Sequence, residues 1–338
     1  MKNKKGFEMQ FNWIFVLVAG MVILLFFTMV VVEQKGVSET TAKATVLKSM
    51  ESIIVGAGVS ADTTVKTTIP KSEIAIDCGR ISIGTVNRPF QNMILFAPQL
   101  VKGDIIVTQT QTFSIPYKVA NLLDMSSTGI LYIIIGKNEL ASYINSTFPK
   151  ELTKEQHDTF NSAQINAYKY YEVRFAVFGT EPEIQAFVNS FPQALKKMPD
   201  VDVTAVVAAG DLQKGQLDFY TKKNDRWGTP VKSSYVGLQS LMSAFYVDSA
   251  DLYTCSMDSV FAKLNLVNHI YTKRTQKLME GTSSDCNPIY ASALATLSNI
   301  DSRSKEFNKQ NALALPAEAD NLKQKNKEAE RNSCPSIY

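Results

Sequence analysis

Four cysteines are the side chains with the clearest chemistry in the sequence: Cys78, Cys255, Cys286 and Cys334. In an exported domain, an even number of cysteines favours disulfides, and four cysteines allow three connectivities. Four buried free thiols are the alternative interpretation. The spacing does not indicate a zinc site, because no Cys-x-x-Cys occurs and the only histidines are His157 and His269.

No catalytic motif stands out. A nucleophilic triad needs a serine or cysteine beside a base, and Gly-x-Ser-x-Gly does not occur. Residues 55–59 (VGAGV) form half of a glycine-rich nucleotide fingerprint, but they follow a predicted helix rather than a strand. We interpret them as the end of that helix. No acidic residue is singled out by an apolar context. We therefore expect no enzyme, no cofactor and no metal site.

Three glycines end predicted strands, and the edge that they share is a candidate ligand site. Gly136, Gly179 and Gly210 each follow an apolar run. In open α/β sheets, ligands bind outside the carboxyl ends of the strands, so we expect a pocket at this edge first. The alternative is that the three glycines only form turns. Separately, Asn145-Ser146-Thr147 is an N-glycosylation acceptor, which has meaning only outside the cytoplasm.

The elements that would position these residues begin with an apolar segment. Phe11–Val32 contains no charge over 22 residues, and at ~1.5 Å per residue it spans ~33 Å, enough for a hydrocarbon core of ~30 Å. We predict a transmembrane helix over 11–32. A cleaved secretory signal would have a shorter apolar region and a small-x-small cleavage site. A buried core helix is the other alternative.

Lysines on one side of this segment predict its orientation. Lys2, Lys4 and Lys5 precede it, and the first charge after it is Glu33. The positive-inside rule places residues 1–10 in the cytoplasm as a basic stub and the rest of the chain outside the cytoplasm.

A helical extension, 33–58, follows the apolar segment. Its apolar residues recur at spacings of three and four between Thr40 and Ile54, which predicts a helix with one face against the exported domain. Short apolar or alternating runs separated by turn residues then predict a small antiparallel β unit over 59–116, with strands at 65–69, 73–77, 80–84, 92–97 and 104–113.

Residues 117–233 predict an α/β unit with a mainly parallel sheet. Strands are expected at 130–136, 170–179, 201–210 and 216–222, and helices at 138–147, at 152–167 and after the N-cap Thr180. The fold class is therefore α+β or α/β, completed by a C-terminal helical bundle over 234–338. The bundle helices are expected at 235–246, 256–279, 288–308 and 317–331.

These helices bear on the disulfide connectivity. A continuous helix over 256–279 would hold Cys255 and Cys286 about 30 Å apart, far beyond the limit of ~7 Å between Cα atoms. Antiparallel helices joined by a turn at Pro316 would return Cys334 to Cys286. The preferred pairing is therefore Cys286–Cys334, which leaves Cys78–Cys255 to connect the β unit to the helices.

Composition fits a folded protein and gives no sign of nucleic-acid binding. Hydrophobic residues make up 45% and charged residues 20% of 338 residues, and the formal net charge is +3. Nucleic-acid binding calls for a clustered basic face, whereas Lys and Arg are scattered here.

The N-terminus resembles that of archaeal type IV pilin-like proteins. Lys4-Lys5-Gly6, a short polar patch with Glu8 and a long apolar helix carry the resemblance. It implies cleavage after Gly6, with Phe7 as the new terminus, and assembly through the apolar helices. The acidic residue usual at the fifth mature position falls at the second here, which departs from the family. The remainder resembles single-pass membrane-anchored archaeal proteins that bring no function with them.

The sequence therefore leaves three candidate functions for the protein. The first is an extracytoplasmic structural or interaction protein, such as a pilin-like or envelope-assembly subunit, whose partners are membrane lipid and proteins or copies of itself joined through the N-terminal helix. The second is an anchored extracytoplasmic ligand-binding domain. The third is an exported enzyme, which would need converging titratable groups.

Overall fold

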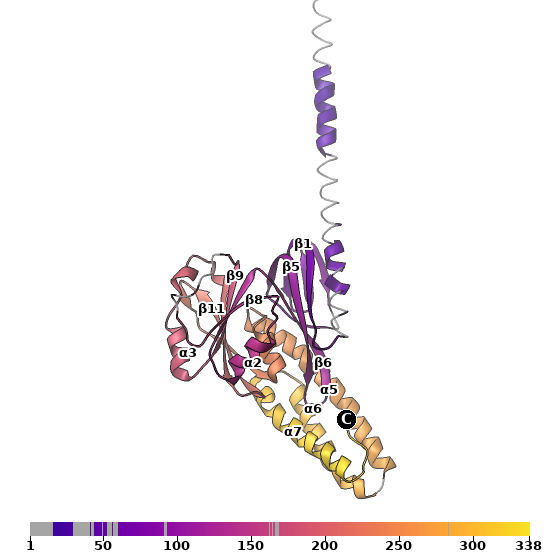
Figure 1. Ribbon diagram of the computed structural model, residues 1–338. Helices are drawn as coiled ribbons and strands as arrows, with labels where there is room; N and C mark the ends of the chain where they lie inside the picture. Colours follow the sequence, from indigo (N-terminus) through magenta and orange to yellow (C-terminus); the bar gives the residue numbers. More distant parts are fainter. Residues whose placement is uncertain are drawn as a thin grey trace, which may run out of the picture.

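Two β-sheets and a set of long C-terminal helices make up the protein (Figure 1). The computed structural model describes residues 16–29, 41, 44–48, 50–52, 56, 60–90, 93–161, 163, 165, 169–282 and 284–338. The mixed α and β composition and the C-terminal helical bundle agree with the expected fold class.

The first sheet, sheet A, has six strands in the order β3-β2-β1-β5-β6-β4. Its strands are β1 (Thr64–Asp77), β2 (Arg80–Ile83), β3 (Val86–Pro89), β4 (Ile94–Phe96), β5 (Leu100–Ser114) and β6 (Lys118–Ser127). All its pairings are antiparallel except that of β4 with β6. A strand is therefore present in every predicted range, but β4, within the predicted 92–97, pairs parallel with β6 rather than antiparallel, and the sheet continues past residue 116 through β6. Residues 65–69 and 73–77 belong to one strand, whose register shifts between Thr68 and Ser72, around Pro70.

The second sheet, sheet B, has the path β12-β11-β10-β9-β7-β8, with β13 paired to β11. Its strands are β7 (Ile130–Ile135), β8 (Thr153–His157), β9 (Glu172–Phe178), β10 (Val203–Gly210), β11 (Lys214–Lys223), β12 (Arg226–Trp227) and β13 (Val231–Val236). Strands β8, β7, β9 and β10 run parallel, and β11, β12 and β13 pair antiparallel. The expected parallel sheet is thus one part of a mixed sheet.

One predicted helix contains a strand instead, and another begins later than predicted. Residues 153–157, inside the helix expected at 152–167, form β8, whose backbone pairs with the buried strand β7. Residues 231–236 form β13, so the helix expected from Tyr235 begins only at Leu238. In both places the pairing with a neighbouring strand decides the conformation, because a polar or short segment has little preference of its own.

The helices and 3₁₀ turns complete the chain. The α-helices are α2 (Glu139–Thr147), α3 (Glu181–Val188), α4 (Leu238–Ala244), α5 (Ala250–Gly281), α6 (Asn287–Ser304) and α7 (Lys309–Arg331). The 3₁₀ turns are η2 (Gln193–Leu195), η3 (Asp200–Asp202) and η4 (Ser284–Cys286). As expected, Thr180 precedes α3, where its backbone N–H and its hydroxyl both donate to the Glu183 carboxylate at 2.8 Å.

The position of Pro316 differs from the prediction. It lies inside α7 rather than in a turn, and α7 begins after Asn308, whose side chain accepts a hydrogen bond from the backbone N–H of Asn311. Proline removes one helical hydrogen bond. Leu315 and Ala319, which flank it, are buried, so packing of this face holds the helix together.

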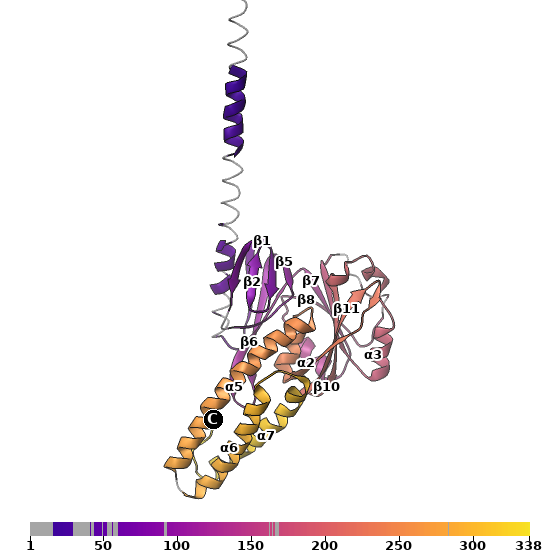
Figure 2. The same cartoon turned by 180° about the vertical axis from the view of Figure 1, so that it is seen from behind.

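Successive side chains along each strand point to opposite faces of the sheet, and the two faces of each sheet belong to different hydrophobic cores. One face of each sheet contributes to a shared central core, for example Leu122 from β6 and Ile134 from β7. The outer face of sheet A forms a second core, and the outer face of sheet B packs with Phe187 of α3 and Trp227 in a third. Helices α5, α6 and α7 extend the central core into a projection that we call the helical arm (Figures 1 and 2).

The N-terminal segment is described in part. Residues 16–29 are helical, and their large apolar side chains are exposed, from 51% at Leu17 to 74% at Met29. The rest of the predicted 11–32 span lies outside the described residues, as do residues 1–10 with Gly6 and Phe7. Within the part of the chain that is described, no helix is both long and apolar enough to cross a membrane.

The predicted helical extension packs against sheet A. Residues 44–48 and 50–52 are helical, and Val46, Leu47 and Met50 are buried in the core on the outer face of that sheet. Gly56 is still helical, whereas Ala57 and Gly58, the rest of the predicted helix end, lie outside the described residues.

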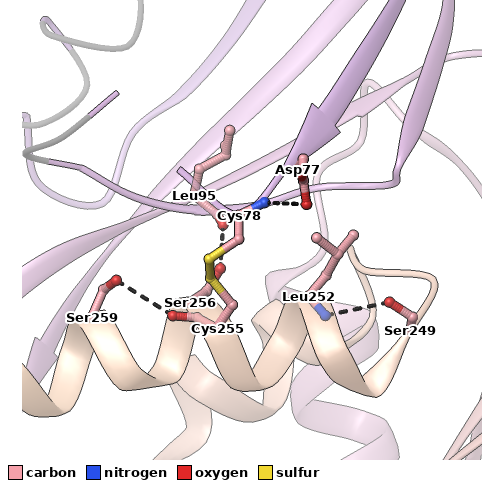
Figure 3. The surroundings of a disulfide bond; sticks show 8 residues. All are labelled: Asp77, Cys78, Leu95, Ser249, Leu252, Cys255, Ser256 and Ser259. Atoms are coloured by element: carbon pink, nitrogen blue, oxygen red, sulfur yellow. Dashed lines mark hydrogen bonds between the residues drawn. A yellow bond between two sulfur atoms is a disulfide. The ribbon is translucent and has the colours of Figure 1, made fainter. Parts of the chain in front are cut away.

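Both predicted disulfides are confirmed. Cys286 pairs with Cys334 inside the helical arm, and Cys78 pairs with Cys255, which joins the end of β1 to α5 (Figure 3). Beside the second bond, the Ser256 hydroxyl donates to the Leu95 carbonyl of β4 at 2.6 Å. Sheet A is therefore connected to the helical arm by a covalent bond and by a hydrogen bond.

Candidate functional site: a charged cavity at the amino ends of the parallel strands

A buried ion-pair network lies where β9 begins. Because side chains alternate along a strand, Glu172 and Arg174 lie on the same face, the one that Ala176 and Phe178 turn toward the central core. Arg174 Nε donates to Glu172 Oε1 at 2.5 Å, and Arg174 Nη1 donates to the Phe245 carbonyl at 3.5 Å. Both charged side chains are almost fully buried.

A second carboxylate reaches this network from the loop before α5. Asp248 Oδ2 lies 3.7 Å from Arg174 Nη2 and accepts a hydrogen bond from the backbone N–H of Gln99 at 2.7 Å. Gln99 precedes β5, so three separate parts of the chain meet here. In the described part of the protein, Asp248 Oδ1 and Arg174 Nη2 are buried and have no hydrogen-bond partner.

The network is short of positive charge. Burial raises the pKa of Glu172 to about 7, against the opposing effect of Arg174. Burial also lowers the pKa of Arg174, but Glu172, Tyr132 and Asp248 outweigh it and raise that pKa, so the guanidinium stays charged. One guanidinium therefore serves two carboxylates in a water-poor environment.

A cavity of about 330 Å³ opens over the two carboxylates. It lies between the start of β5, the amino ends of β9 and β10, and the loop before α5. Its lining residues are Gln99, Leu100, Lys102, Tyr171, Glu172, Val201, Asp202, Thr204, Thr221, Asp248 and Ser249. Burial raises the pKa of Asp202, while Lys102 opposes that shift.

Tyr171 forms one wall of the cavity and is held at several points. Its hydroxyl accepts from the backbone N–H of Lys102 at 3.0 Å and lies 2.9 Å from Ser127 Oγ. Lys102 Nζ lies 5.4 Å from the centre of its ring. A Cβ at Gly129 would come within 2.6 Å of that ring, so only glycine lets the ring lie there.

The three glycines of the predicted ligand edge do lie at one edge, because β7, β9 and β10 are adjacent and parallel. A Cβ at Gly136 would meet the Phe178 carbonyl oxygen at 2.2 Å, and one at Gly210 would meet the Lys214 carbonyl oxygen at 2.4 Å. Gly136 and Gly210 thus allow close backbone packing, whereas a Cβ at Gly179 would meet the Glu183 side chain at 2.9 Å. The charged cavity lies at the opposite, amino end of the same strands.

Asn145, the predicted glycosylation acceptor, lies in the last part of α2. It is half-buried, and its side-chain amide donates to Gln156 Oε1 of β8 at 2.5 Å. Its amide nitrogen is therefore engaged with the neighbouring edge strand.

The sequence contains a signal for this site. The prediction that no acidic residue stands out by an apolar context overlooked it. Glu172 and Arg174 interrupt the apolar strand YYEVRFAVFG at alternate positions. A charged pair spaced by two in a buried strand must share a face and must be paired. Asp248 carries no comparable signal, because only the tertiary fold brings its loop to β9.

Another buried carboxyl group lies in the central core. Asp124 of β6 is fully buried, accepts a hydrogen bond from Gln111 Nε2 at 2.5 Å and has no ion pair among the described residues. Burial raises its pKa to about 7, although the nearby Ser243 hydroxyl and the Gln111 amide oppose the shift; Oδ1 of Asp124 has no hydrogen-bond partner among the described residues. It lines none of the three cavities described here.

Two further cavities are present. One, of about 320 Å³, lies beside the Cys78–Cys255 disulfide, between sheet A and α5. The other, of about 200 Å³, lies between α7 and the turn before α4. In the described residues, no three His, Cys, Asp or Glu side chains are grouped so that they could hold a metal ion.

Comparisons with protein-family models, curated proteins and solved structures give no match for this chain. The assignment of a function therefore rests on the chemistry of the chain itself.

Proposed function

We propose that the protein is a single-pass membrane-anchored structural or interaction protein whose folded part lies outside the cytoplasm. The observation that carries the proposal is the helix of residues 16–29, whose large apolar side chains are exposed. They belong to the uncharged stretch Phe11–Val32, and lipid is the environment in which such side chains need no protein partner.

The next helical residues support a firm connection between anchor and folded part. Val46, Leu47 and Met50 are buried on sheet A. The two disulfides, of the kind that forms in oxidising compartments, fit a location outside the cytoplasm.

The helical arm supports an interaction role. Leu266 and Ile270, four residues apart on α5, are 63% and 59% exposed. Residues at this spacing share a helix face. A more specific version of this proposal is that the protein is a pilin-like or envelope-assembly subunit.

Alkaline extraction of native membranes tests the anchor. The full chain stays in the membrane pellet, and a chain starting at residue 33, exported behind a cleavable signal, is released. Release of the full chain would refute the anchor. Particles larger than a monomer in detergent extracts support the assembly role, and a mature chain that still begins before Phe7 would refute its pilin form.

The second candidate function is an anchored ligand-binding domain. It is favoured by one observation, the cavity of about 330 Å³ over Glu172 and Asp248. This volume lies in the range of small-molecule sites.

A further inference from the structure

The charged cavity has walls of unequal charge. Glu172, Asp202 and Asp248 contribute three carboxylates, and Lys102 contributes one ammonium group. Arg174 is not part of the lining, and its guanidinium is divided between two carboxylates, Glu172 at 2.5 Å and Asp248 at 3.7 Å. The walls therefore favour a cation.

One carboxylate oxygen among the residues that line the cavity accepts no hydrogen bond. Asp248 Oδ1 is buried and lacks a hydrogen bond within the described residues, as does Arg174 Nη2, which lies 3.7 Å from Asp248 Oδ2; Oδ2 accepts a hydrogen bond from the backbone N–H of Gln99. Burial of an acceptor without a donor is unfavourable. An ammonium group brings three donors and a positive charge together.

The rest of the lining suits a short apolar stem. Leu100, Val201 and the ring of Tyr171 line the cavity, and Val201 is 72% exposed. The His, Cys, Asp and Glu side chains of the described residues form no group that could hold a metal ion.

We propose that this cavity binds a small organic cation, a primary ammonium on a short apolar stem. The ammonium group lies against Asp248 and Glu172, and Asp202 adds charge at the cavity wall. The stem lies along Tyr171, Leu100 and Val201. This inference rests on the second candidate function and names its ligand class.

The full chain in a non-ionic maltoside detergent is titrated with n-propylammonium chloride and followed by saturation-transfer NMR. n-Propanol and propionate are the neutral and anionic probes of similar shape, and sodium chloride matches the ionic strength. The ammonium probe shows saturable transfer, and the two others do not.

Three variants locate the binding. Asp202→Asn removes a half-buried charge outside the Arg174 network and weakens the ammonium probe about five-fold, as expected for ~1 kcal/mol. Thr221→Trp fills the cavity from an exposed position and abolishes the transfer. Asp104→Asn, an exposed acid on β5 outside the lining, leaves it unchanged. Circular dichroism verifies the fold of each.

The other outcomes separate two failures. A response to n-propanol or propionate that Thr221→Trp removes means that the cavity binds a ligand of another class, which overturns the ammonium assignment alone. If no probe gives a response that Thr221→Trp removes, both the ammonium assignment and the ligand-binding function at this cavity fall.

Discussion

At the scale of single residues, the protein buries charged groups in two different ways. Glu172 and Asp248 share Arg174, so their charges are partly compensated. Asp124 has no ion pair among the described residues; its Oδ2 accepts a hydrogen bond from Gln111 Nε2, and its buried Oδ1 has no hydrogen-bond partner there. An unpaired buried carboxyl group favours its neutral form. The two sites should therefore respond differently to pH and to mutation.

Asp124 makes the folded protein less stable as pH rises. Its pKa is about 7 in the folded state against an ordinary value of 3.8. The folded state therefore binds the proton more tightly, and the contribution present below pH ~4 is lost between pH ~4 and ~7. Asp124→Asn should raise the free energy of unfolding by about 1 kcal/mol at pH 4.5 and by about 4 kcal/mol at pH 8.

Urea denaturation at both pH values measures this difference. Asp104→Asn, an exposed acid, is the control and should follow the wild type. Glu172 has a raised pKa in both proteins, so its effect cancels in the comparison. Parallel pH profiles of wild type and Asp124→Asn would contradict the assignment.

At the scale of elements, sequence patterns predicted the strands and helices whose conformation depends on their own residues. The runs at 130–136 and 170–179 are apolar enough to require strands buried on both faces, and β7 and β9 are such strands. The long helix expected over 256–279 is α5, and its length excluded a Cys255–Cys286 bond. That exclusion left two connectivities, and the expected antiparallel return of the last helix toward Cys286 selected the observed one.

The pattern could not predict elements that depend on a partner strand. Strand β8 has the polar sequence TKEQH and owes its conformation to the parallel pairing with β7. The charged cavity depends on tertiary structure in the same way, because β5, β9 and the loop before α5 are distant in sequence. Only the pair Glu172 and Arg174 was readable in advance, from its spacing in an apolar strand.

The two disulfides should differ in how much stability they give. Cys78–Cys255 closes a sequence separation of 177 residues and Cys286–Cys334 one of 48. Loop-closure entropy then predicts losses of roughly 2–5 kcal/mol for each double serine variant, with that of Cys78→Ser/Cys255→Ser greater by about 1 kcal/mol.

Thermal unfolding of the two variants, with the reduced wild type as the control, measures the order. The wild type under reducing conditions should be at least as unstable as either variant. An equal or smaller loss for Cys78→Ser/Cys255→Ser would show that sheet A stays attached to the helical arm without the covalent bond.

At the scale of the whole molecule, the structural units follow one another in space in the order of the chain. An apolar N-terminal helix leads to helical residues packed on sheet A, sheet A shares a core with sheet B, and the helical arm projects from that core (Figures 1 and 2). With the helix of residues 16–29 in lipid, as proposed, the arm is the part of the molecule that lies far from the membrane.

Amine labelling of intact cells with a membrane-impermeant reagent tests this arrangement most directly. Lys323 on α7 is 51% exposed, and Lys2 precedes the apolar segment. We expect the reagent to modify Lys323 and spare Lys2, with both modified after permeabilisation. Modification of Lys2 with Lys323 spared would place the folded part in the cytoplasm and contradict the proposed function.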